Sequence, residues 1–168
     1  MDRYDQQAPE RSHRPARYLS IRPRLEWTRQ PGTGPGTAVL GPLAGRTVIE
    51  IGCGSGHNLA HLVAVHHTTG IGIDHDVAKI SRASDLYGHL SNLAFILGDA
   101  AAVLGTMPPS AADLCMSIFG AFSFSPPGPL LRAAAQVLRP GGRLAITLRA
   151  DEYHDHIVVL IRRNDTAT

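Results

Sequence analysis

The chain has few of the residues that form a disulfide framework, a metal site or a membrane segment. Its 168 residues include two cysteines, Cys53 and Cys115, and no Cys or His spacing that is typical of a metal site. Two cysteines at predicted loop and strand positions indicate reduced thiols. No apolar run approaches the roughly 18 residues of a membrane-spanning helix, and the first residues lack the apolar stretch of a secretory signal. We therefore expect a cytoplasmic protein without a metal or a membrane partner.

Charged residues are also sparse, at 18% of the chain, and they are unevenly distributed. Residues 1–29 carry seven arginines against four acids, so the net charge of +2 originates there. This segment predicts a flexible basic arm over residues 1–24, followed by one domain over residues 25–168. The arginines are not interleaved with aromatic residues, so a nucleic-acid partner is not expected. With 43% hydrophobic residues, the chain can bury one sizeable core.

The most informative pattern is a short apolar run that leads into three alternating glycines. Residues 47–51 predict a buried strand, and a helical pattern follows over residues 57–67. Between them, Gly52, Gly54 and Gly56 predict a turn whose backbone passes close to a ligand or takes positive φ. Open α/β sheets bind ligands at such strand-to-helix turns, although a turn of this kind also serves as a plain tight connection.

Two acids accompany this turn. Glu50 stands two residues before the first glycine, where the dinucleotide fingerprint G-x-G-x-x-G does not call for an acid, and His57 replaces the last glycine of that fingerprint. A second strand pattern, over residues 70–74, ends in Asp74, so both acids are expected at the same edge of two parallel strands. An acid there can accept both hydroxyls of a ribose. Asp76 is the better candidate to cap the helix that follows.

Further patterns complete the expected fold. Strands are predicted over residues 92–97, 113–118, 143–148 and 156–161, and helices over residues 77–90 and 129–138. Strands alternating with helices predict a doubly wound α/β fold with a mostly parallel, Rossmann-like sheet of six strands.

In this order, the motifs resemble those of the class I S-adenosylmethionine-dependent methyltransferases. The resemblance extends over about residues 25–149, and its motifs are residues 50–56, 72–74, 98–100, 113–117 and 138–144. It implies S-adenosylmethionine as the cofactor. Residues 125–128, Ser-Pro-Pro-Gly, do not match the Pro-Pro-aromatic motif of nucleic-acid amino-methyltransferases, so a small-molecule acceptor is favoured.

The resemblance also implies which residues bind the cofactor. The glycine loop would approach its methionine and ribose parts, Glu50 would act near its amino group, and Asp74 would bind the ribose hydroxyls. His75 would lie against the adenine, Asp99 and Ala100 would meet the adenine amino edge, and the end of the fourth strand would border the methyl donor. Cys53 is expected to be a small loop residue rather than a nucleophile. The implied set is Glu50, Gly52, Cys53, Gly54, Gly56, Asp74, His75, Asp99, Ala100, Ser117 and Phe119.

No catalytic base is identified, although many histidines are able to take a proton. None lies in a motif that assigns it this role: His57, His61, His66, His67, His75, His89, His154 and His156. Methyl transfer needs a base only for some acceptors, because the sulfonium already activates the methyl group.

The segments on either side of the motifs leave alternatives open. The only tryptophan, Trp27, lies in a Gly- and Pro-rich stretch, residues 25–36. The resemblance implies a lid over the cofactor there, and a linker whose tryptophan packs on the domain surface is the alternative. After the fifth strand, the family pattern has a helix and two strands, whereas residues 151–168 have room for one strand. A second copy in a homodimer could cover the resulting edge.

The sequence therefore predicts an S-adenosylmethionine-dependent methyltransferase that acts on a small molecule. The alternative is a noncatalytic, methyltransferase-like binding protein, because the shortened C-terminal part puts activity in doubt. A nicotinamide-dependent enzyme ranks third because of His57.

Overall fold

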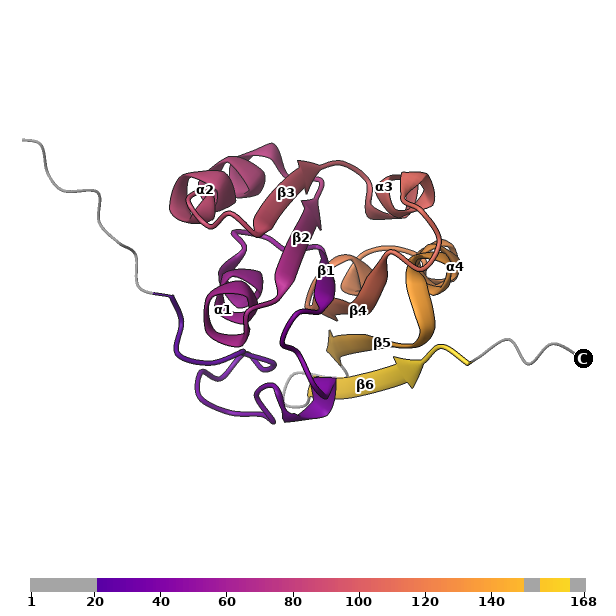
Figure 1. Cartoon of the computed structure of the whole chain (residues 1–168), viewed down its shortest axis with the longest axis horizontal. Helices are drawn as coiled ribbons and strands as arrows, with labels where there is room; N and C mark the ends of the chain where they lie inside the picture. The colour runs from indigo at the N-terminus through magenta and orange to yellow at the C-terminus, as the bar shows by residue number, and fades with distance from the viewer. Residues whose placement is uncertain (1–20, 150–154, 164–168) are drawn as a thin grey trace, which may run out of the picture.

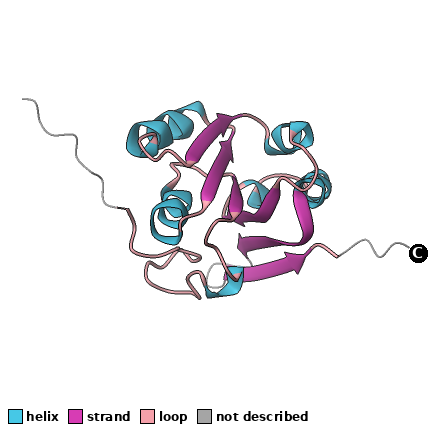
Figure 2. Ribbon diagram, in the orientation of Figure 1, coloured by secondary structure: helices cyan, strands magenta, loops and turns pink. Residues whose placement is uncertain are grey.

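The computed structural model describes residues 21–149 and 155–163, which form a sheet flanked by helices (Figures 1 and 2). The sheet has six strands in the order β3-β2-β1-β4-β5-β6, and all neighbours are parallel except β5 and β6. The strands are β1 Thr47–Ile51, β2 Thr69–Asp74, β3 Leu93–Leu97, β4 Ala112–Ile118, β5 Leu138–Arg149 and β6 Asp155–Ile161. The predicted α/β class and the six strands are confirmed.

Four helices cover the two faces of the sheet. They are α1 His57–His66, α2 Val77–Tyr87, α3 Ala100–Thr106 and α4 Pro127–Val137. Figure 1 shows α1 and α2 on one face, and α3 and α4 on the other. Each face has its own apolar core: Leu104 and Val137 belong to the core under α3 and α4, and Leu59 and Met116 to the core under α1. This two-sided burial explains why the strands read as nearly continuous apolar runs.

Local sequence explains where the helices begin. Asp76 caps α2 as predicted, because its side chain accepts hydrogen bonds from the backbone N–H groups of Ala78 and Lys79. Asp99 caps α3 in the same way by accepting from the N–H of Ala102, 2.9 Å away. The sequence patterns did not predict α3, a short helix of 7 residues.

The start of the fifth strand differs most from the prediction. Strand β5 begins at Leu138 and not at Arg143, because Leu138 pairs with Ala112 before the register shifts between Ala112 and Leu114. The motif that contains Gly141 therefore lies inside the strand, and Gly141 has a positive φ of 76°. A bulge of this kind absorbs residues that sequence patterns assign to a turn.

Trp27 belongs to the core, which contradicts both interpretations of its segment. Its side chain is fully buried, packs in the core under α1 with Leu25 and Leu40, and donates a hydrogen bond from Nε1 to the backbone oxygen of Gly36. The tryptophan therefore neither covers a ligand nor lies on the surface. It anchors the N-terminal segment to the domain.

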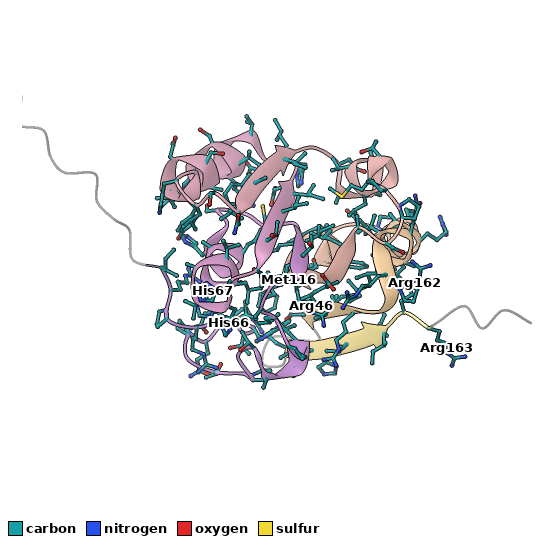
Figure 3. The ribbon with its side chains drawn as sticks, viewed as in Figure 1. Arg46, His66, His67, Met116, Arg162 and Arg163 are labelled. Carbon is teal, nitrogen blue, oxygen red and sulfur yellow. The ribbon has the colours of Figure 1, made fainter. Side chains whose placement is uncertain are left out.

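Strand β6 is the last strand of the described sheet and carries apolar side chains that face solvent. Val158, Val159, Leu160 and Ile161 are between 36% and 61% exposed. Figure 3 shows Arg162 and Arg163 at the end of this strand, whereas Met116 lies in the middle of the fold. A dimer over this edge stays a prediction.

Candidate functional site

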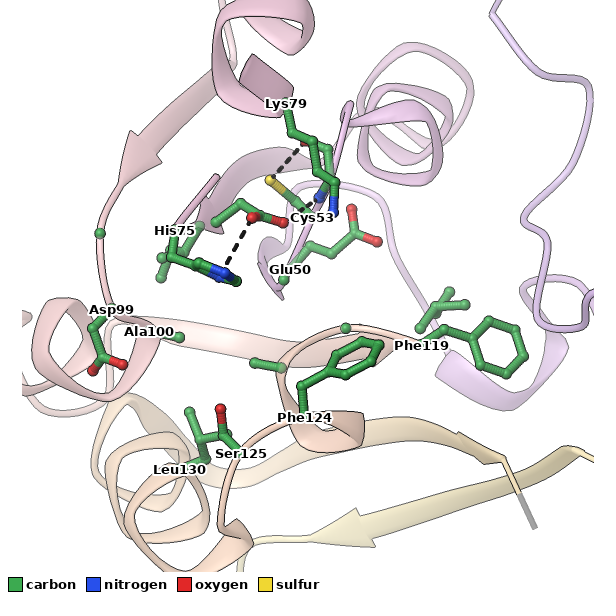
Figure 4. A pocket seen from close by; sticks show the side chains of 18 of the residues that line it. Glu50, Cys53, His75, Lys79, Asp99, Ala100, Phe119, Phe124, Ser125 and Leu130 are labelled. Carbon is green, nitrogen blue, oxygen red and sulfur yellow. Dashed lines mark hydrogen bonds and ion pairs between the residues drawn. The ribbon is translucent and has the colours of Figure 1, made fainter. Parts of the chain in front are cut away.

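A pocket of about 470 Å³ opens at the carboxyl ends of the parallel strands (Figure 4). Its walls come from the glycine loop after β1, the end of β2, the start of α3 and the loop between β4 and α4. This is the usual ligand position in a doubly wound sheet, where the strand order reverses beside β1. Nine predicted residues line it: Glu50, Gly52, Cys53, Gly54, Asp74, His75, Asp99, Ala100 and Phe119.

The three glycines of the loop have two different roles. Gly52 has a φ of 78°, and a Cβ there would lie 2.5 Å from the backbone nitrogen of Ala121. Gly54 has a φ of 54°, and a Cβ there would meet nothing within 4 Å. Gly56 does not line the pocket, because a Cβ there would point at the ring of Phe95, 2.5 Å away. Gly54 is thus the glycine beside open space, and Gly52 and Gly56 allow close packing.

Ser117 also lies outside the pocket lining. It is fully buried in β4, and its hydroxyl donates a hydrogen bond of 2.7 Å to the backbone oxygen of Ile51 at the end of β1. The side chain therefore joins two neighbouring strand ends. It stabilises the frame of the pocket from behind.

Glu50 places a buried carboxyl group against the pocket. The residue is 3% exposed, and burial raises the pKa of this carboxyl to about 8. The neighbouring Asp74 raises the pKa further, whereas the backbone N–H of Leu59 and the charge of Arg22 act in the opposite direction. Among the described residues, Glu50 Oε2 has no hydrogen-bond partner. A buried carboxylate oxygen without a partner is costly, so the site is suited to a cationic or hydrogen-donating ligand.

Asp74 holds the glycine loop in place. Its Oδ2 accepts a hydrogen bond of 2.8 Å from the N–H of Gly54, and its Oδ1 accepts one of 3.0 Å from the N–H of Asp76. The carboxylate is 6% exposed, and the imidazole of His75 lies 3.8 Å from Oδ1. Each carboxylate oxygen can accept a second hydrogen bond, so Asp74 can support the loop and still receive a ligand hydroxyl.

The two ends of the pocket differ in character. Figure 4 shows His75, Asp99 and Ala100 at one end and Phe119 at the other. Asp99 uses Oδ1 to cap α3, so its second oxygen is left for a ligand. Phe119 is not a glycine, yet it has a positive φ of 49°. Backbone strain of this kind concentrates at functional sites.

Several lining residues lie outside the sequence motifs. They are Arg22, His57, Asn58, Lys79, Phe124, Ser125 and Leu130, with other residues of the same loops. Phe124 is 83% exposed, an unusual position for a large aromatic side chain. Of this group, the sequence patterns singled out only His57 and residues 125–128, and neither received a binding role. No sequence signal indicated Arg22, because residues 1–24 are predicted to form the flexible arm.

Two of the histidines that could take a proton lie in the pocket. His57 and His75 line the pocket, and Nδ1 of His57 shares a hydrogen bond of 2.6 Å with the hydroxyl of Tyr87. Burial lowers the pKa of His57, and the charges of Arg22 and Arg82 lower it further.

The remaining candidates lie elsewhere. His61 is buried against the N-terminal segment, His156 lies on β6, and His154 is outside the described residues. The structure therefore brings His57 and His75 to the pocket, and it leaves His61 and His156 apart from it.

Cys53 lines the pocket without being a nucleophile. Burial raises the pKa of its thiol, and the acids Glu50 and Asp74 raise it further, so the thiolate is not formed at neutral pH. Within the described residues, no group of three or more His, Cys, Asp or Glu side chains is arranged to hold a metal ion. In the same part of the chain, no helix is both long and apolar enough to cross a bilayer.

Comparison with known protein families decides what kind of protein carries this pocket. Residues 49–146 match the model of the methyltransferase domain family. The chain belongs to this family. The match runs from β1 into β5, so it includes the strand ends and loops that form most of the pocket of this methyltransferase domain. The resemblance to the class I S-adenosylmethionine-dependent methyltransferases is confirmed.

Solved structures with the same fold include several methyltransferases. One from Thiobacillus denitrificans, an S-adenosylmethionine-dependent methyltransferase in complex with S-adenosylhomocysteine, is 30% identical, with a TM-score of 0.55 over 66% of this chain and 44% of that chain. The YcgJ protein from Bacillus subtilis is 25% identical, with a TM-score of 0.58 over 65% and 46%. An arsenic(III) S-adenosylmethionine methyltransferase from Chlamydomonas reinhardtii is 27% identical, with a TM-score of 0.54 over 63% and 39%.

This methyltransferase domain spans less than half of the length of each of these structures. A search of curated proteins gave no significant match.

Asp74→Ala should weaken S-adenosylmethionine binding by roughly 1–3 kcal/mol, the usual penalty for leaving a buried partner without its hydrogen bond. The variant loses the acceptor for the Gly54 N–H and a buried carboxylate with room for a second hydrogen bond at each oxygen. Titration calorimetry measures the change. Asp85→Ala is the matched control, because it removes one exposed acid from α2, outside the pocket lining. Unchanged affinity in the Asp74 variant would contradict the ribose assignment.

Proposed function

We propose that this methyltransferase domain binds S-adenosylmethionine in the pocket beside β1 and transfers its methyl group to a small, largely apolar acceptor. The observation that carries the proposal is the buried, unpartnered Oε2 of Glu50 next to the open space at Gly54. A cofactor that has a cationic amino group and can lie against the backbone at Gly54 fits both features. The family and the S-adenosylhomocysteine of the Thiobacillus structure imply the same cofactor.

Each part of the cofactor is proposed to contact a different group of residues. Glu50 would receive the amino group, and the loop at Gly54 would lie along the methionine and ribose parts. Asp74 would accept the ribose hydroxyls, and Asp99 with its neighbours would meet the adenine. The resemblance to the class I methyltransferases implies these roles, and the position of all these residues in the lining of one pocket supports them.

Methyl transfer requires the protein mainly to orient the acceptor and the methyl donor. When bound, S-adenosylmethionine supplies a methyl group that is already activated by its sulfonium. The chain then has to hold an acceptor in line and exclude water. Phe119 and Phe124 border the pocket on the β4 side, and no side chain there is assigned as a base.

The lining of that side supports an apolar acceptor of modest size. Ile118, Ala121, Pro129 and Leu130 line the pocket together with the two phenylalanines. A pocket of this size is typical of small-molecule sites. The Chlamydomonas structure is named for a small acceptor, arsenic(III), which agrees with the modest size of the proposed acceptor.

Methyl transfer from isotopically labelled S-adenosylmethionine to a panel of small apolar amines, phenols, thiols and carbon acids tests the proposal. The proposed function predicts labelled product with at least one class and none in the Gly54→Val variant, whose branched side chain would fill the cofactor space. Cofactor binding without transfer to any class would favour the noncatalytic binding protein.

A further inference from the structure

We propose that the chain forms a homodimer in which the β6 strands of two copies pair antiparallel, so that the two sheets become one. The surface involved is the edge of β6 that faces away from β5, from Asp155 to Arg163. No residue of this strand belongs to the pocket lining. The inference therefore goes beyond the proposed function and does not depend on the cofactor.

The hydrogen bonds of Arg162 show which backbone groups of β6 point to this edge. Its N–H donates to the oxygen of Gly142, and its C=O accepts from the N–H of Gly141, both at 2.9 Å. The backbone groups of Arg162 therefore point toward β5. Because this direction alternates along a strand, the residues one, three and five positions earlier point their N–H and C=O groups away from β5. These groups have no backbone partner among residues 21–149 and 155–163, and they belong to Ile157, Val159 and Ile161.

The side chains of β6 are apolar and exposed on both faces of the sheet. Val159 and Ile161 on one face are 36% and 61% exposed, and Val158 and Leu160 on the other are 37% and 45% exposed. Figure 1 shows β6 at the margin of the fold, beyond β5. A run that is apolar on both faces is typical of an interior strand, and at an edge it is a template for another strand.

The symmetry of a dimer restricts how two copies of β6 can pair. The two-fold axis that makes the strands antiparallel is perpendicular to the sheet, so each face of β6 stays on its own side. Residues that lie opposite each other share a face, which requires residue numbers with an even sum. The outward backbone groups of residues 157, 159 and 161 meet this condition, because odd-numbered residues then pair with odd-numbered residues.

Charge selects one of the registers that symmetry allows. With Val159 on the axis, Asp155 of each copy lies opposite Arg163 of the other, at both ends of the paired strands. The next register in one direction places Asp155 opposite Ile161, and the next in the other direction places Arg163 opposite Ile157. Opposite charges that face each other across a strand pair stabilise it. The register with Val159 on the axis is therefore favoured.

Asp155 can accept a second arginine. Its Oδ1 lies 3.3 Å from Nε of Arg29, and its Oδ2 accepts a hydrogen bond from the backbone N–H of the same residue. Each carboxylate oxygen has a second acceptor position, so the guanidinium of Arg163 from a second copy can be added. Asp113 has this arrangement within the chain, because its Oδ1 lies 2.8 Å and 2.6 Å from nitrogens of two arginines.

The selected register also pairs the apolar side chains. Val159 lies opposite its own copy and Ile157 opposite Ile161 on one face, and Val158 lies opposite Leu160 on the other. The odd-numbered pairs would exchange about six N–H···O bonds between the copies. Because an interface of two strands is small, we expect a dissociation constant in the micromolar range.

Sedimentation velocity of the full chain, in a dilution series up to about 100 μM, tests the proposal. We expect a species with twice the 18.0 kDa of one chain at the highest concentration. Val159→Lys would place two like charges opposite each other on the axis, so the dissociation constant should rise by about 10-fold or more. Val65→Lys is the matched control, because it adds the same charge at a side chain of α1 that is 49% exposed. It should dimerise as the unsubstituted chain does, and circular dichroism shows whether each variant is folded.

A cysteine on the axis tests the register. In Val159→Cys the two Cα atoms would lie about 5.5 Å apart, so an added oxidant should join the thiols in a covalent dimer. Ile161→Cys is the control on the same face. Two positions from the axis, its Cα atom would lie about 14 Å from that of its copy, too far for a disulfide. The native Cys53 and Cys115 are both buried.

Three results would overturn the proposal. The first is a monomer at about 100 μM. The second is a dimer that Val159→Lys leaves intact, because the copies would then meet on another surface. The third is a covalent dimer of Ile161→Cys and none of Val159→Cys, because the strands would then pair in another register. None of these measurements uses the cofactor, so their outcome is independent of the proposed function.

Discussion

Glu50→Gln is expected to raise the free energy of unfolding by about 3 kcal/mol at pH 7, because a buried acid is replaced by a neutral amide. The same change is expected to weaken S-adenosylmethionine binding by about 10-fold or more, since the ammonium loses its ionic partner. Glu50 would thus be a residue that lowers stability in order to bind a ligand. Stability and binding would change in opposite directions, which a purely structural residue does not produce.

The dependence on pH follows from the pKa of Glu50. In the folded chain this pKa is about 8, above its ordinary value of 4.5, so between these limits the folded state holds a proton that the unfolded state releases. Stability therefore falls as the pH rises through this window. The advantage of Glu50→Gln should be absent below about pH 4.5, grow up to about pH 8 and stay level above it. Denaturant unfolding of both proteins across this range measures it, and an equal stability at every pH would contradict the account.

The ligand should respond to the same group. The unsubstituted chain should bind S-adenosylhomocysteine more tightly as the pH rises from about 6 to about 8, because Glu50 has to lose its proton before it pairs with the ammonium. Glu50→Gln is the control, and its affinity should change much less over this interval. Calorimetry in buffers of different ionisation enthalpy detects the released proton directly.

Gly52→Ala should mainly impair folding and Gly54→Ala should mainly impair binding, although both change a glycine of the same loop. In Gly52→Ala the new methyl group would lie 2.5 Å from Ala121 N and 2.7 Å from Gly120 Cα. The positive φ costs about 1–2 kcal/mol, and overpacking against rigid backbone costs about 1–3 kcal/mol more. We expect a loss of about 2–5 kcal/mol in the free energy of unfolding.

Gly54→Ala meets nothing within 4 Å in the protein, so only the cost of its positive φ applies, about 1–2 kcal/mol. Its methyl group would instead occupy pocket space, and S-adenosylmethionine binding should fall by about 10-fold or more. Thermal unfolding and calorimetry on both variants separate the two effects. A folded Gly54→Ala variant with normal affinity would show that the ligand does not approach this glycine.

The strands and the glycine loop could be predicted because their signals are local. The run before Gly52 alternates neither like a surface strand nor like a helix, so it identifies a buried parallel strand. The capping acid Asp76 marks the start of α2 in the same direct way. The loop at Gly54 and the acid Asp74 then follow from the positions of the strand ends, and the structure joins them through a hydrogen bond of 2.8 Å.

The unpredicted parts depend on contacts between distant residues. Trp27 lies in a Gly- and Pro-rich stretch, and only its packing against residues far along the chain makes it a core residue. Arg22 reaches the pocket because His61, 39 positions later, binds its backbone oxygen. Gly56 looks equivalent to Gly54 in the sequence, and only the position of Phe95 on β3 gives it a packing role. Sequence spacing shows which residues can meet a ligand, but tertiary contacts decide which ones do.

The central claim is that the pocket binds S-adenosylmethionine, and parallel calorimetric titrations of the full chain test it most directly. The ligands are S-adenosylmethionine, S-adenosylhomocysteine and a nicotinamide dinucleotide. The account predicts binding of the first two in the micromolar range, at about −8 kcal/mol or tighter. It predicts no binding of the dinucleotide, because the G-x-G-x-x-G fingerprint of dinucleotide-binding proteins is interrupted at His57. Binding of the dinucleotide alone, or of no ligand, would contradict it.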